Sequence, residues 1–402
     1  MMKPNGSILM GIICVAVAVC AALPAHSLTQ EEREAGFEAL FDGNNMDKWF
    51  TLGERNTFSV ENSILTCSGE GGVVLRTKEV FEDYILRLSY KISEGGNSGV
   101  FLHAVDHARD SRVGGEIQVL DSHGRDPSPH IAGALYDVHA PQVNAARPHD
   151  QWNELEIHFE WPRLHVKLNG EVVQDIDDLR DNHKTRYRVR FGNIGLQDHG
   201  SPAWYRNIRI KDLGGNARDS WISLMEDDEL NDLETDQPPQ GWVSIGDGNW
   251  HYDEQGGDRV LQINRGEGAL IYTEAYQNFA LWGYVRTSGR GYGAICTRWN
   301  GVNDKGYQVL LNHDKFAELA TGTIKDLVPV EDLIVDHDAW APMKIVVRDD
   351  VITVLVNGTI VAEYLPIDVR KGNIALLRDS CCGEVELKDL RIKPLPTTLA
   401  MD

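Results

Sequence analysis

The sequence is poor in cysteine and in basic residues. Of its six cysteines, the four beyond the N-terminal segment are Cys67, Cys296, Cys381 and Cys382, and no CxxC pair is repeated. This pattern argues against a zinc site and against a disulfide scaffold, although a disulfide of Cys296 with Cys381 or Cys382 stays open. The 61 acidic residues outnumber the 39 basic ones. A nucleic-acid partner is therefore not expected, because phosphate backbones are bound by clustered Lys and Arg.

Long apolar runs are absent beyond the N-terminus. Lys3 is followed by an uncharged stretch over residues 8–23, and Ala25 and Ser27 are small residues suited to a cleavage site. This pattern predicts a signal peptide over residues 1–27, with a retained anchor as the alternative. We therefore expect a secreted or periplasmic protein whose mature chain has no membrane span. The remaining length favours two domains.

An internal repeat defines the domain organisation. Residues 152–175 match residues 340–364: each segment has a tryptophan, an alternating strand, a turn, a second strand and an Asn-Gly turn. Residues 191–213 match residues 371–395 in the same way. The chain is therefore expected to be a tandem duplication.

Each copy has the pattern of an all-β domain. Tyr84, Leu86 and Leu88 alternate with polar residues, as expected of strands with one packed face and one wet face. Helical spacing is found only over residues 29–41. We predict two β-sandwich domains over residues 35–214 and 219–397, joined by a short linker.

The two copies differ in their polar residues. Folding residues should persist in both copies, whereas polar residues present in the first copy alone are candidates for chemistry. Matching similar letters pairs Gln118 with Gln308, so Gln118 is also a candidate scaffold residue. The pairs that differ are Glu116 with Gly306, Asp121 with Leu311, His103 with Thr297, Gln197 with Leu377, Asp198 with Arg378 and His199 with Asp379. The chemistry is therefore predicted to lie in the first sandwich.

The polar residues of the first copy fall on a few strands and can line one concave face. Carboxylates, amides and imidazoles at fixed places suit the hydroxyl groups of a sugar. Ordinary solvated surface is the alternative, but it does not account for the simultaneous loss of so many positions in the second copy. The candidates are Asn97, His103, Glu116, Gln118, Asp121, Gln197, Asp198 and His199, with Tyr136 as a platform for the sugar ring.

Several motifs of the first half together resemble one family. They are "FEALFDGNNMDKW", "GGNSGVFLH", "GGEIQVLD", "AGALYDVHAP", "WNELEI", "LNGEVV" and "IGLQDHGSPAWYRNIRIKDL". In combination they resemble the 3-keto-disaccharide hydrolase family, whose fold is similar to the concanavalin-like jelly roll of laminarinases. The resemblance covers about residues 38–213 and implies a concanavalin-like sandwich there. We expect the second half to be a diverged copy of similar fold, a laminin-G-like or concanavalin-like accessory sandwich that is non-catalytic. Glu116, Gln118 and Asp121 match the spacing of the laminarinase pattern E-x-D-x-x-E, but Gln118 replaces its middle carboxylate.

The resemblance implies elimination chemistry on a 3-keto-glycoside, followed by addition of water. Such a route needs a base near C2, an acid at the glycosidic oxygen and a positive group at the enolate oxygen. We expect His199 or His103 as the base, Glu116 as the acid or as an orienting contact to a sugar hydroxyl, and Arg206 or a bound cation at the enolate. Asp121, Asp198 and the histidines are candidate ligands of a divalent cation.

Two other functions stay open: a non-catalytic carbohydrate-binding protein built from two sandwiches, and an endo-glucanase-like glycoside hydrolase. No GxGxxG fingerprint follows a strand. The leading hypothesis therefore requires a separate oxidoreductase that first oxidises the sugar.

Overall fold

The computed structural model describes residues 28–397 except 53–54, 107, 216, 218, 226–237, 239, 256, 290–291, 302, 315–317, 333 and 379–382. The predicted signal peptide and both Cys381 and Cys382 lie outside the described residues. Cys296 is a free, buried thiol. No helix among the described residues is long and apolar enough to cross a bilayer.

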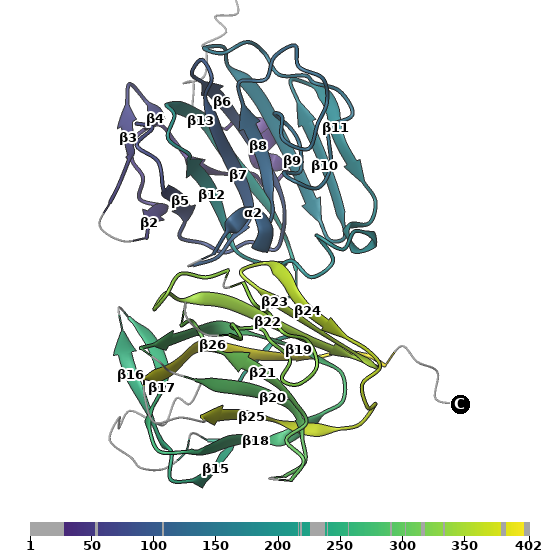
Figure 1. The fold of residues 1–402 in the computed structure, drawn as a ribbon. Coiled ribbons are helices and arrows are strands. Elements are labelled where there is room, and N and C mark those ends of the chain that lie inside the picture. Colours follow the sequence, from purple (N-terminus) through teal and green to yellow (C-terminus); the bar gives the residue numbers. More distant parts are fainter. Residues whose placement is uncertain are drawn as a thin grey trace, which may run out of the picture.

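Two β-sandwiches follow one another along the chain, and one end of the first lies against the outer face of a sheet of the second (Figure 1). Each consists of an 8-stranded and a 5-stranded antiparallel sheet packed face to face. The prediction of an all-β protein with two tandem sandwiches is confirmed.

The first sandwich pairs its strands across long sequence distances. Its 8-stranded sheet has the order β11-β10-β9-β6-β13-β4-β3, with β1 paired to β13. Its strands are β1 (Glu38–Phe41), β3 (Phe58–Glu61), β4 (Ile64–Cys67), β6 (Asp83–Ile92), β9 (Asn153–Glu160), β10 (Arg163–Leu168), β11 (Glu171–Ile176) and β13 (Ala203–Gly214). The 5-stranded sheet has the order β2-β5-β12-β7-β8. It comprises β2 (Trp49–Thr51), β5 (Val73–Thr77), β7 (Asn97–Ala104), β8 (Glu116–Leu120) and β12 (Asn193–Asp198).

The second sandwich repeats this arrangement. Its 8-stranded sheet has the order β16-β17-β26-β19-β22-β23-β24, with β14 paired to β26. Its strands are β14 (Ile222–Ser223), β16 (Asn249–Gln255), β17 (Asp258–Arg265), β19 (Phe279–Ser288), β22 (Ala341–Arg348), β23 (Val351–Val356), β24 (Thr359–Tyr364) and β26 (Glu384–Pro394). The 5-stranded sheet, β15-β18-β25-β20-β21, contains β15 (Trp242–Gly246), β18 (Gly268–Tyr276), β20 (Gly293–Trp299), β21 (Tyr307–Leu311) and β25 (Gly372–Arg378).

The cores follow the period-two pattern of the sequence. Tyr84, Leu86 and Leu88 of β6 are buried between the sheets of the first sandwich, together with Val100 of β7 and Leu196 of β12. The intervening residues of β6 at its start face outward and are half-buried. Burial of this alternating apolar face is the main stabilising contribution.

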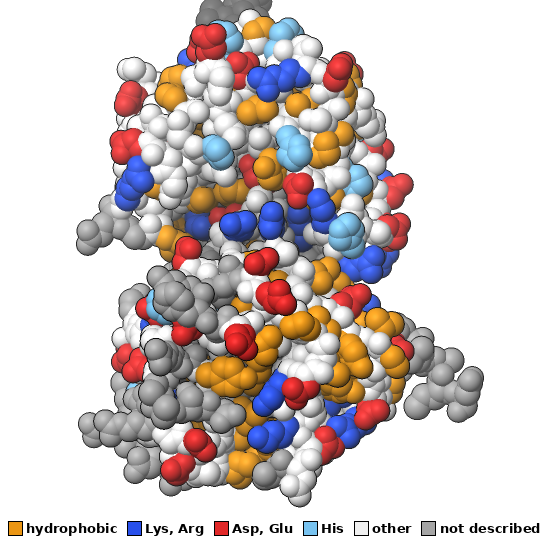
Figure 2. Space-filling view, in the orientation of Figure 1, with side chains coloured by type: hydrophobic (Ala, Val, Ile, Leu, Met, Phe, Trp, Pro, Cys, Tyr) orange, Lys and Arg blue, Asp and Glu red, His pale blue; other side chains and the backbone are white. Residues whose placement is uncertain are grey.

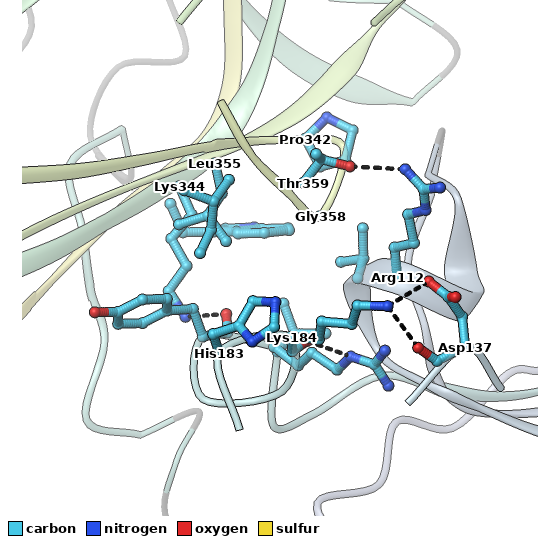
Figure 3. Close-up of a pocket in the computed structure, with 15 residues that line it drawn as sticks. Arg112, Asp137, His183, Lys184, Pro342, Lys344, Leu355, Gly358 and Thr359 are labelled. Carbon is cyan, nitrogen blue, oxygen red and sulfur yellow. Dashed lines mark hydrogen bonds and ion pairs between the residues drawn. The ribbon is translucent and has the colours of Figure 1, made fainter. Parts of the chain in front are cut away.

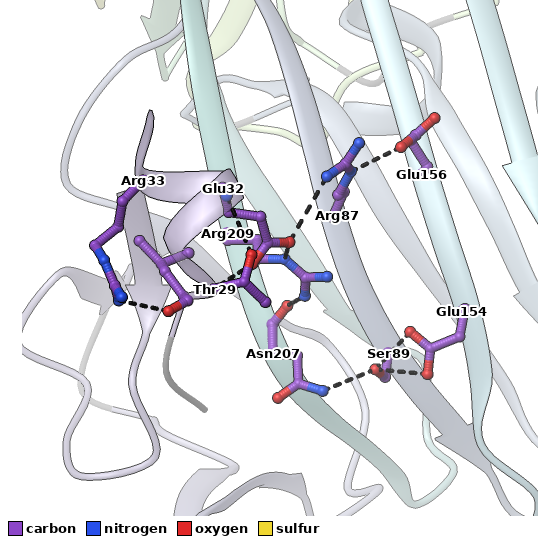
Figure 4. Close-up of polar contacts among 10 residues, drawn as sticks. Thr29, Glu32, Arg33, Arg87, Ser89, Glu154, Glu156, Asn207 and Arg209 are labelled. Carbon is purple, nitrogen blue, oxygen red and sulfur yellow. Dashed lines mark hydrogen bonds and ion pairs between the residues drawn. The ribbon is translucent and has the colours of Figure 1, made fainter. Parts of the chain in front are cut away.

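The N-terminal helix is shorter than the sequence pattern predicts. Helix α1 (Gln30–Glu34) begins at a capping box between Thr29 and Glu32, and residues 38–41 form strand β1 instead. The Glu32 carboxylate accepts a hydrogen bond from Arg209 and pairs with Arg87 at 3.6 Å (Figure 4). These contacts hold α1 against the 8-stranded sheet.

Helix α2 (Asp110–Val113) lies where the two sandwiches meet (Figure 1). The backbone N–H of Arg109 donates to Asn357 Oδ1 at 2.7 Å, and the guanidinium of Arg112 donates to Thr359 Oγ1 at 3.0 Å. Val113 packs in a cluster with Trp282 of the second sandwich. Residues 186–191 are a second segment of the first sandwich at this junction. The short 3-10 helix η1 (Leu179–Asp181) precedes them in the chain.

Candidate active site

A cavity of about 540 Å³ lies on the outer face of the 5-stranded sheet of the first sandwich. Strands β5, β7, β8 and β12 form its floor, and α2 with the residue before it forms one wall. Its polar lining consists of Asn97, Arg109, Asp110, Ser111, Glu116, Gln118, Tyr136, Gln197, Asp198 and His199. Seven of the ten residues predicted for the site therefore lie together.

Strand β8 directs Glu116 and Gln118 into this cavity, while Ile117 and Val119 point into the core. Glu116 is only 3% exposed. A Cβ atom on Gly99 of the neighbouring strand would lie 2.0 Å from Glu116 Oε1, so glycine at this position makes room for the carboxyl group. The sequence "GGEIQVLD" thus places a nearly fully buried acid at the floor of the cavity.

Burial raises the pKa of Glu116 to about 8, and the nearby Asp110 contributes to the increase. Arg188 partly offsets these effects. Glu116 is therefore protonated at neutral pH. A carboxylic acid that keeps its proton at pH 7 can donate it to a leaving group.

Asp110 was not predicted from the sequence. It forms a bidentate ion pair with Arg76 of β5, with an Nη2–Oδ2 distance of 2.9 Å, and both side chains are at most 5% exposed. Asp110 Oδ1 also accepts the backbone N–H of Val105 at 3.0 Å. Burial raises the pKa of Asp110 to about 6, although Arg76 opposes the shift. The pair fixes α2 to the sheet beside Glu116.

Strand β12 contributes two buried oxygen atoms without a partner among the described residues: Gln197 Oε1 and Asp198 Oδ2. The other oxygen of Asp198 accepts backbone N–H groups from Gly71 at 3.0 Å and Gly200 at 2.9 Å. Buried acceptors without donors are costly unless a ligand satisfies them. The exposed His199 follows at the rim.

The opposite side of the cavity is lined by amides and a phenol. Gln118 Nε2 donates to Asn97 Oδ1 at 3.1 Å, which fixes the orientation of both amides. The Tyr136 ring packs edge to face against His130, with ring centroids 5.3 Å apart. These groups offer donors, acceptors and a ring surface at fixed positions, as sugar recognition requires.

Three predicted site residues lie outside the cavity. His103 is fully buried, packs against Phe159 and is hydrogen-bonded through Nε2 to the carbonyl of Glu82 at 2.9 Å. Its pKa is lowered to about 4 by burial. Asp121 accepts the backbone N–H of Gly95 at 2.9 Å and stabilises a turn.

Arg206 is the third predicted site residue that lies outside the cavity. Its guanidinium lies 4.0 Å from the ring centroid of Trp152, on the 8-stranded sheet. The expectation that Arg206 reaches the site is wrong in this structure. Arg109 is the basic side chain that lines the cavity among the described residues.

Strand pairing corrects the alignment of the two copies. Phe101 pairs with Glu116 in the first sandwich, and the equivalent Cys296 pairs with Gln308 in the second. Glu116 therefore corresponds to Gln308, not to Gly306. By the same register, Gln118 corresponds to Leu310 and His103 to Arg298.

The second sandwich keeps a cavity of about 370 Å³ at the equivalent place. Leu310, Leu377 and Arg378 line it where the first sandwich has Gln118, Gln197 and Asp198, and Gln308 replaces Glu116. The acid and the amides of Gln118 and Gln197 are therefore absent from the second cavity at these positions. The predicted pairs of Gln197 with Leu377 and Asp198 with Arg378 are confirmed.

The described residues contain no group of three or more His, Cys, Asp or Glu side chains arranged to hold a metal ion. Asp121 and Asp198, both expected as ligands, instead accept backbone N–H groups from Gly95 and from Gly71 and Gly200, respectively. The described side chains therefore do not form the divalent-cation site that was considered.

Comparison with known proteins finds relatives of this chain. A 3-keto-disaccharide hydrolase of Bacteroides thetaiotaomicron is 24% identical over 229 residues, covering 44% of this chain and 79% of the relative. Among solved structures, a candidate glycosyl hydrolase of Parabacteroides distasonis is 22% identical, with a TM-score of 0.42, and covers 47% of this chain and 99% of that one. A second from the same organism is 25% identical, with a TM-score of 0.39, and covers 44% and 99%.

One family model, described as a 3-keto-alpha-glucoside-1,2-lyase-like domain, matches residues 36–211 and again residues 220–393. The same family thus accounts for both sandwiches, in agreement with the expectation that the second is a diverged copy of the first. The chain belongs to the family of 3-keto-disaccharide hydrolase domains and contains two copies of that domain.

Proposed function

We propose that the first sandwich cleaves 3-keto-glycosides by elimination of the aglycone and addition of water. The observation that carries this proposal is Glu116: a buried acid that lines a cavity and keeps its proton at neutral pH. Family membership supplies the keto-glycoside as the substrate class.

The proposed reaction begins at C2 of the sugar, whose proton is acidified by the ketone at C3. A base removes this proton, and the electron pair forms an enolate with the C3 oxygen. The enolate then expels the aglycone oxygen from C1, which takes a proton from an acid, and leaves a C1–C2 double bond conjugated to the ketone. Water adds its oxygen to C1 and a proton to C2, so the net reaction is hydrolysis.

The lining of the cavity suggests a role for each group. Glu116 is the acid that protonates the departing oxygen, because its proton is held at neutral pH. His199 at the rim is the base. Arg109 takes the place that the sequence assigned to Arg206 and stabilises the enolate oxygen. The unpartnered oxygens of Gln197 and Asp198 accept hydrogen bonds from sugar hydroxyls.

A direct experiment separates the three candidate functions. Purified protein is incubated with a glucoside and, in parallel, with its 3-keto derivative, and release of the aglycone is measured. We expect release from the keto compound alone. Release from the unoxidised glucoside would indicate an ordinary glycoside hydrolase, and binding without release from either would indicate a carbohydrate-binding protein.

Two further parts of the hypothesis follow from the sequence, and a third follows from the strand pairing. We infer that the protein acts after export, as a secreted or periplasmic protein, because residues 1–27 have the pattern of a signal peptide. A separate oxidoreductase must supply the ketone. The second sandwich is non-catalytic, since Gln308 holds the place of the acid and lacks a proton to give.

A further inference from the structure

A second cavity, of about 330 Å³, lies between the two sandwiches. It is formed by residues 186–191 of the first sandwich and by strands β19, β22 and β26 with flanking residues of the second. A neighbouring cavity of about 280 Å³ shares Tyr187, Arg188 and Lys344 with it and extends toward α2 (Figure 3). Both are distinct from the cavity that holds Glu116.

The lining of this interdomain cavity is strongly basic. Arg186, Arg188 and Arg190 come from the first sandwich, and Lys344, Arg348 and Lys393 from the second. No acidic side chain is among the described residues that line it. The whole chain has a formal net charge of −22. A cluster of positive charge in this cavity is therefore opposite in sign to the net charge of the protein. Figure 2 shows Lys and Arg side chains along the rim where the sandwiches meet.

The positive groups repel one another. The pKa of Lys344 is lowered to about 7, first by burial and then by Lys393 and Arg190. The pKa of Lys393 is also lowered by burial and by Arg190, with a partial offset from Glu82. Cations placed at mutually unfavourable distances are costly to the fold unless an anion joins them.

Two carboxyl groups, Asp137 and Glu116, lie near Arg188, and Asp137 is already paired with Lys184. The carboxylates near Arg190 are engaged as well. Glu82 accepts the backbone N–H of Ala217 at 2.7 Å, and Asp83 accepts that of Trp161 at 3.0 Å. The charges of Glu82 and Asp83 favour the charged form of Arg190, but neither side chain lines the cavity. The remaining basic residue of the lining, Arg180, is paired with Asp178.

Donors remain available inside the cavity. Arg190 Nε is buried and has no hydrogen-bond partner among the described residues. Lys344 Nζ donates to the carbonyl of Tyr187 at 2.9 Å, and an ammonium group has three N–H bonds. These donors and charges match the oxygens of a phosphate or sulfate group.

Aromatic rings complete the lining. Trp161, Tyr187, Trp221 and Trp282 all border the cavity. The guanidinium of Arg190 lies over the Trp161 ring, 5.1 Å from its centroid. Such rings provide flat apolar surface beside the charges, which suits a ligand that carries its anionic group on a ring.

We propose that the interdomain cavity binds a small organic anion, namely a phosphate or sulfate group carried on a ring. Basic side chains of both sandwiches contact the anionic group, and the aromatic side chains contact the ring. The ligand thereby joins the two domains. This site is separate from the proposed catalytic function, and its test requires no turnover of sugar.

The proposal is tested by calorimetric titration of the full chain with phenyl phosphate, phenyl sulfate and neutral phenol at constant ionic strength. We expect binding of at least one of the two anions and no binding of the neutral compound at this site. The preferred anion identifies the group that the site is built for. Lys344→Met and Arg348→Gln should each weaken that binding about tenfold or more, because each removes a charged donor.

Lys78→Met is the matched control, since Lys78 is exposed and lines none of the cavities described above. It removes the same charge and should leave anion binding unchanged. Arg348 is exposed, so its replacement leaves the fold intact even if Lys344→Met does not. Absence of binding by both anions would overturn the proposal. So would anion binding that neither Arg348→Gln nor a folded Lys344→Met weakens relative to Lys78→Met.

Discussion

Glu116 and Gln308 occupy the same position in the two sandwiches, one as a carboxylic acid and the other as its amide. Each extends from the last strand of its 5-stranded sheet into a cavity on the outer face. The second sandwich therefore shows that this fold accommodates glutamine at the position of the acid. The difference between the two copies is the proton that only Glu116 can give.

Replacing Glu116 by glutamine should abolish proton donation while preserving the fold. We expect turnover of a 3-keto-glycoside to fall by about 10²- to 10⁴-fold, the usual contribution of a general acid. Kinetics of aglycone release measure this effect. Glu171→Gln, on the exposed start of β11, should leave the rate unchanged. Near-normal turnover of Glu116→Gln would remove the acid from the mechanism.

The raised pKa of Glu116 also predicts a pH dependence of stability. The folded pKa is about 8 against an ordinary value of 4.5. The stability contributed by the protonated acid is therefore complete below pH 4.5 and is lost as pH rises toward 8. Glu116→Gln does not titrate at this position. The free energy of unfolding of the variant should therefore increase relative to that of the wild type between pH 5 and 8.5. Urea unfolding at both pH values measures this gain, and parallel behaviour of the two proteins would contradict the assigned pKa.

The strands and the core were predictable because their signal is local. The alternation of Leu86 and Leu88 with polar residues determines which face of β6 is buried, and the structure agrees. The polar face of β8 and the end of β12 also predicted the cavity, since their residues are absent from the second copy. Short motifs thus located most of the site.

The alignment of the copies was wrong by two residues on β8 for a physical reason. Matching Gln118 to Gln308 aligned identical letters, and a shift of two residues keeps every side chain on the same face. Hydrophobic alternation therefore does not reveal the error, whereas the pairing of Phe101 with Glu116 and of Cys296 with Gln308 does.

Other features depend on contacts between distant segments. Arg76 and Asp110 pair across 34 positions of sequence, so no motif contains both. The sequence offered one indication of an extra element in the first copy, namely a difference in length. The interval from Ala104 to Glu116 is three residues longer than the one from Trp299 to Gln308. This interval contains α2. The inward orientation of His103, which removes it from the site, depends equally on packing against Phe159.

His199 is the remaining candidate for the base. His199→Gln removes the imidazole but retains a polar side chain, and we expect the rate to fall by about 10²-fold or more with little change in stability. His165→Gln on β10, which does not line the cavity, is the control. Steady-state kinetics at pH 7 decide the point. If both variants retain full turnover, the base is another group.

Gln197 should contribute to substrate binding while it destabilises the folded protein. Its Oε1 is buried without a partner among the described residues, and the second sandwich has Leu377 in its place. We expect Gln197→Leu to raise the Michaelis constant about tenfold and to unfold at equal or higher denaturant concentration. Gln174→Leu provides the contrast, because Gln174 donates to the carbonyls of Gly133 and His139. Gln174→Leu should lower stability without raising the Michaelis constant. If Gln197→Leu instead lowers stability and leaves the Michaelis constant unchanged, Gln197 has a structural role.

The last prediction concerns Gly358, which lies in the second sandwich but contacts the wall of the first cavity. Gly358 has φ +73°, and a Cβ atom there would lie 2.7 Å from backbone atoms of Arg112 and Val113 in α2. Gly358→Ala should therefore displace α2, disturb the pair of Asp110 with Arg76, and lower turnover about tenfold.

Gly170 occupies the equivalent Asn-Gly turn of the first sandwich, with φ +88° and open space around its Cβ position. Gly170→Ala carries the same backbone strain, of order 1 kcal/mol, without the contact. Turnover and thermal unfolding of the two variants, measured side by side, separate strain from displacement. Equal turnover in both would show that the second sandwich does not position α2. A selective loss in Gly358→Ala would show that the first site depends on its neighbour, even though every described side chain lining that site belongs to the first sandwich.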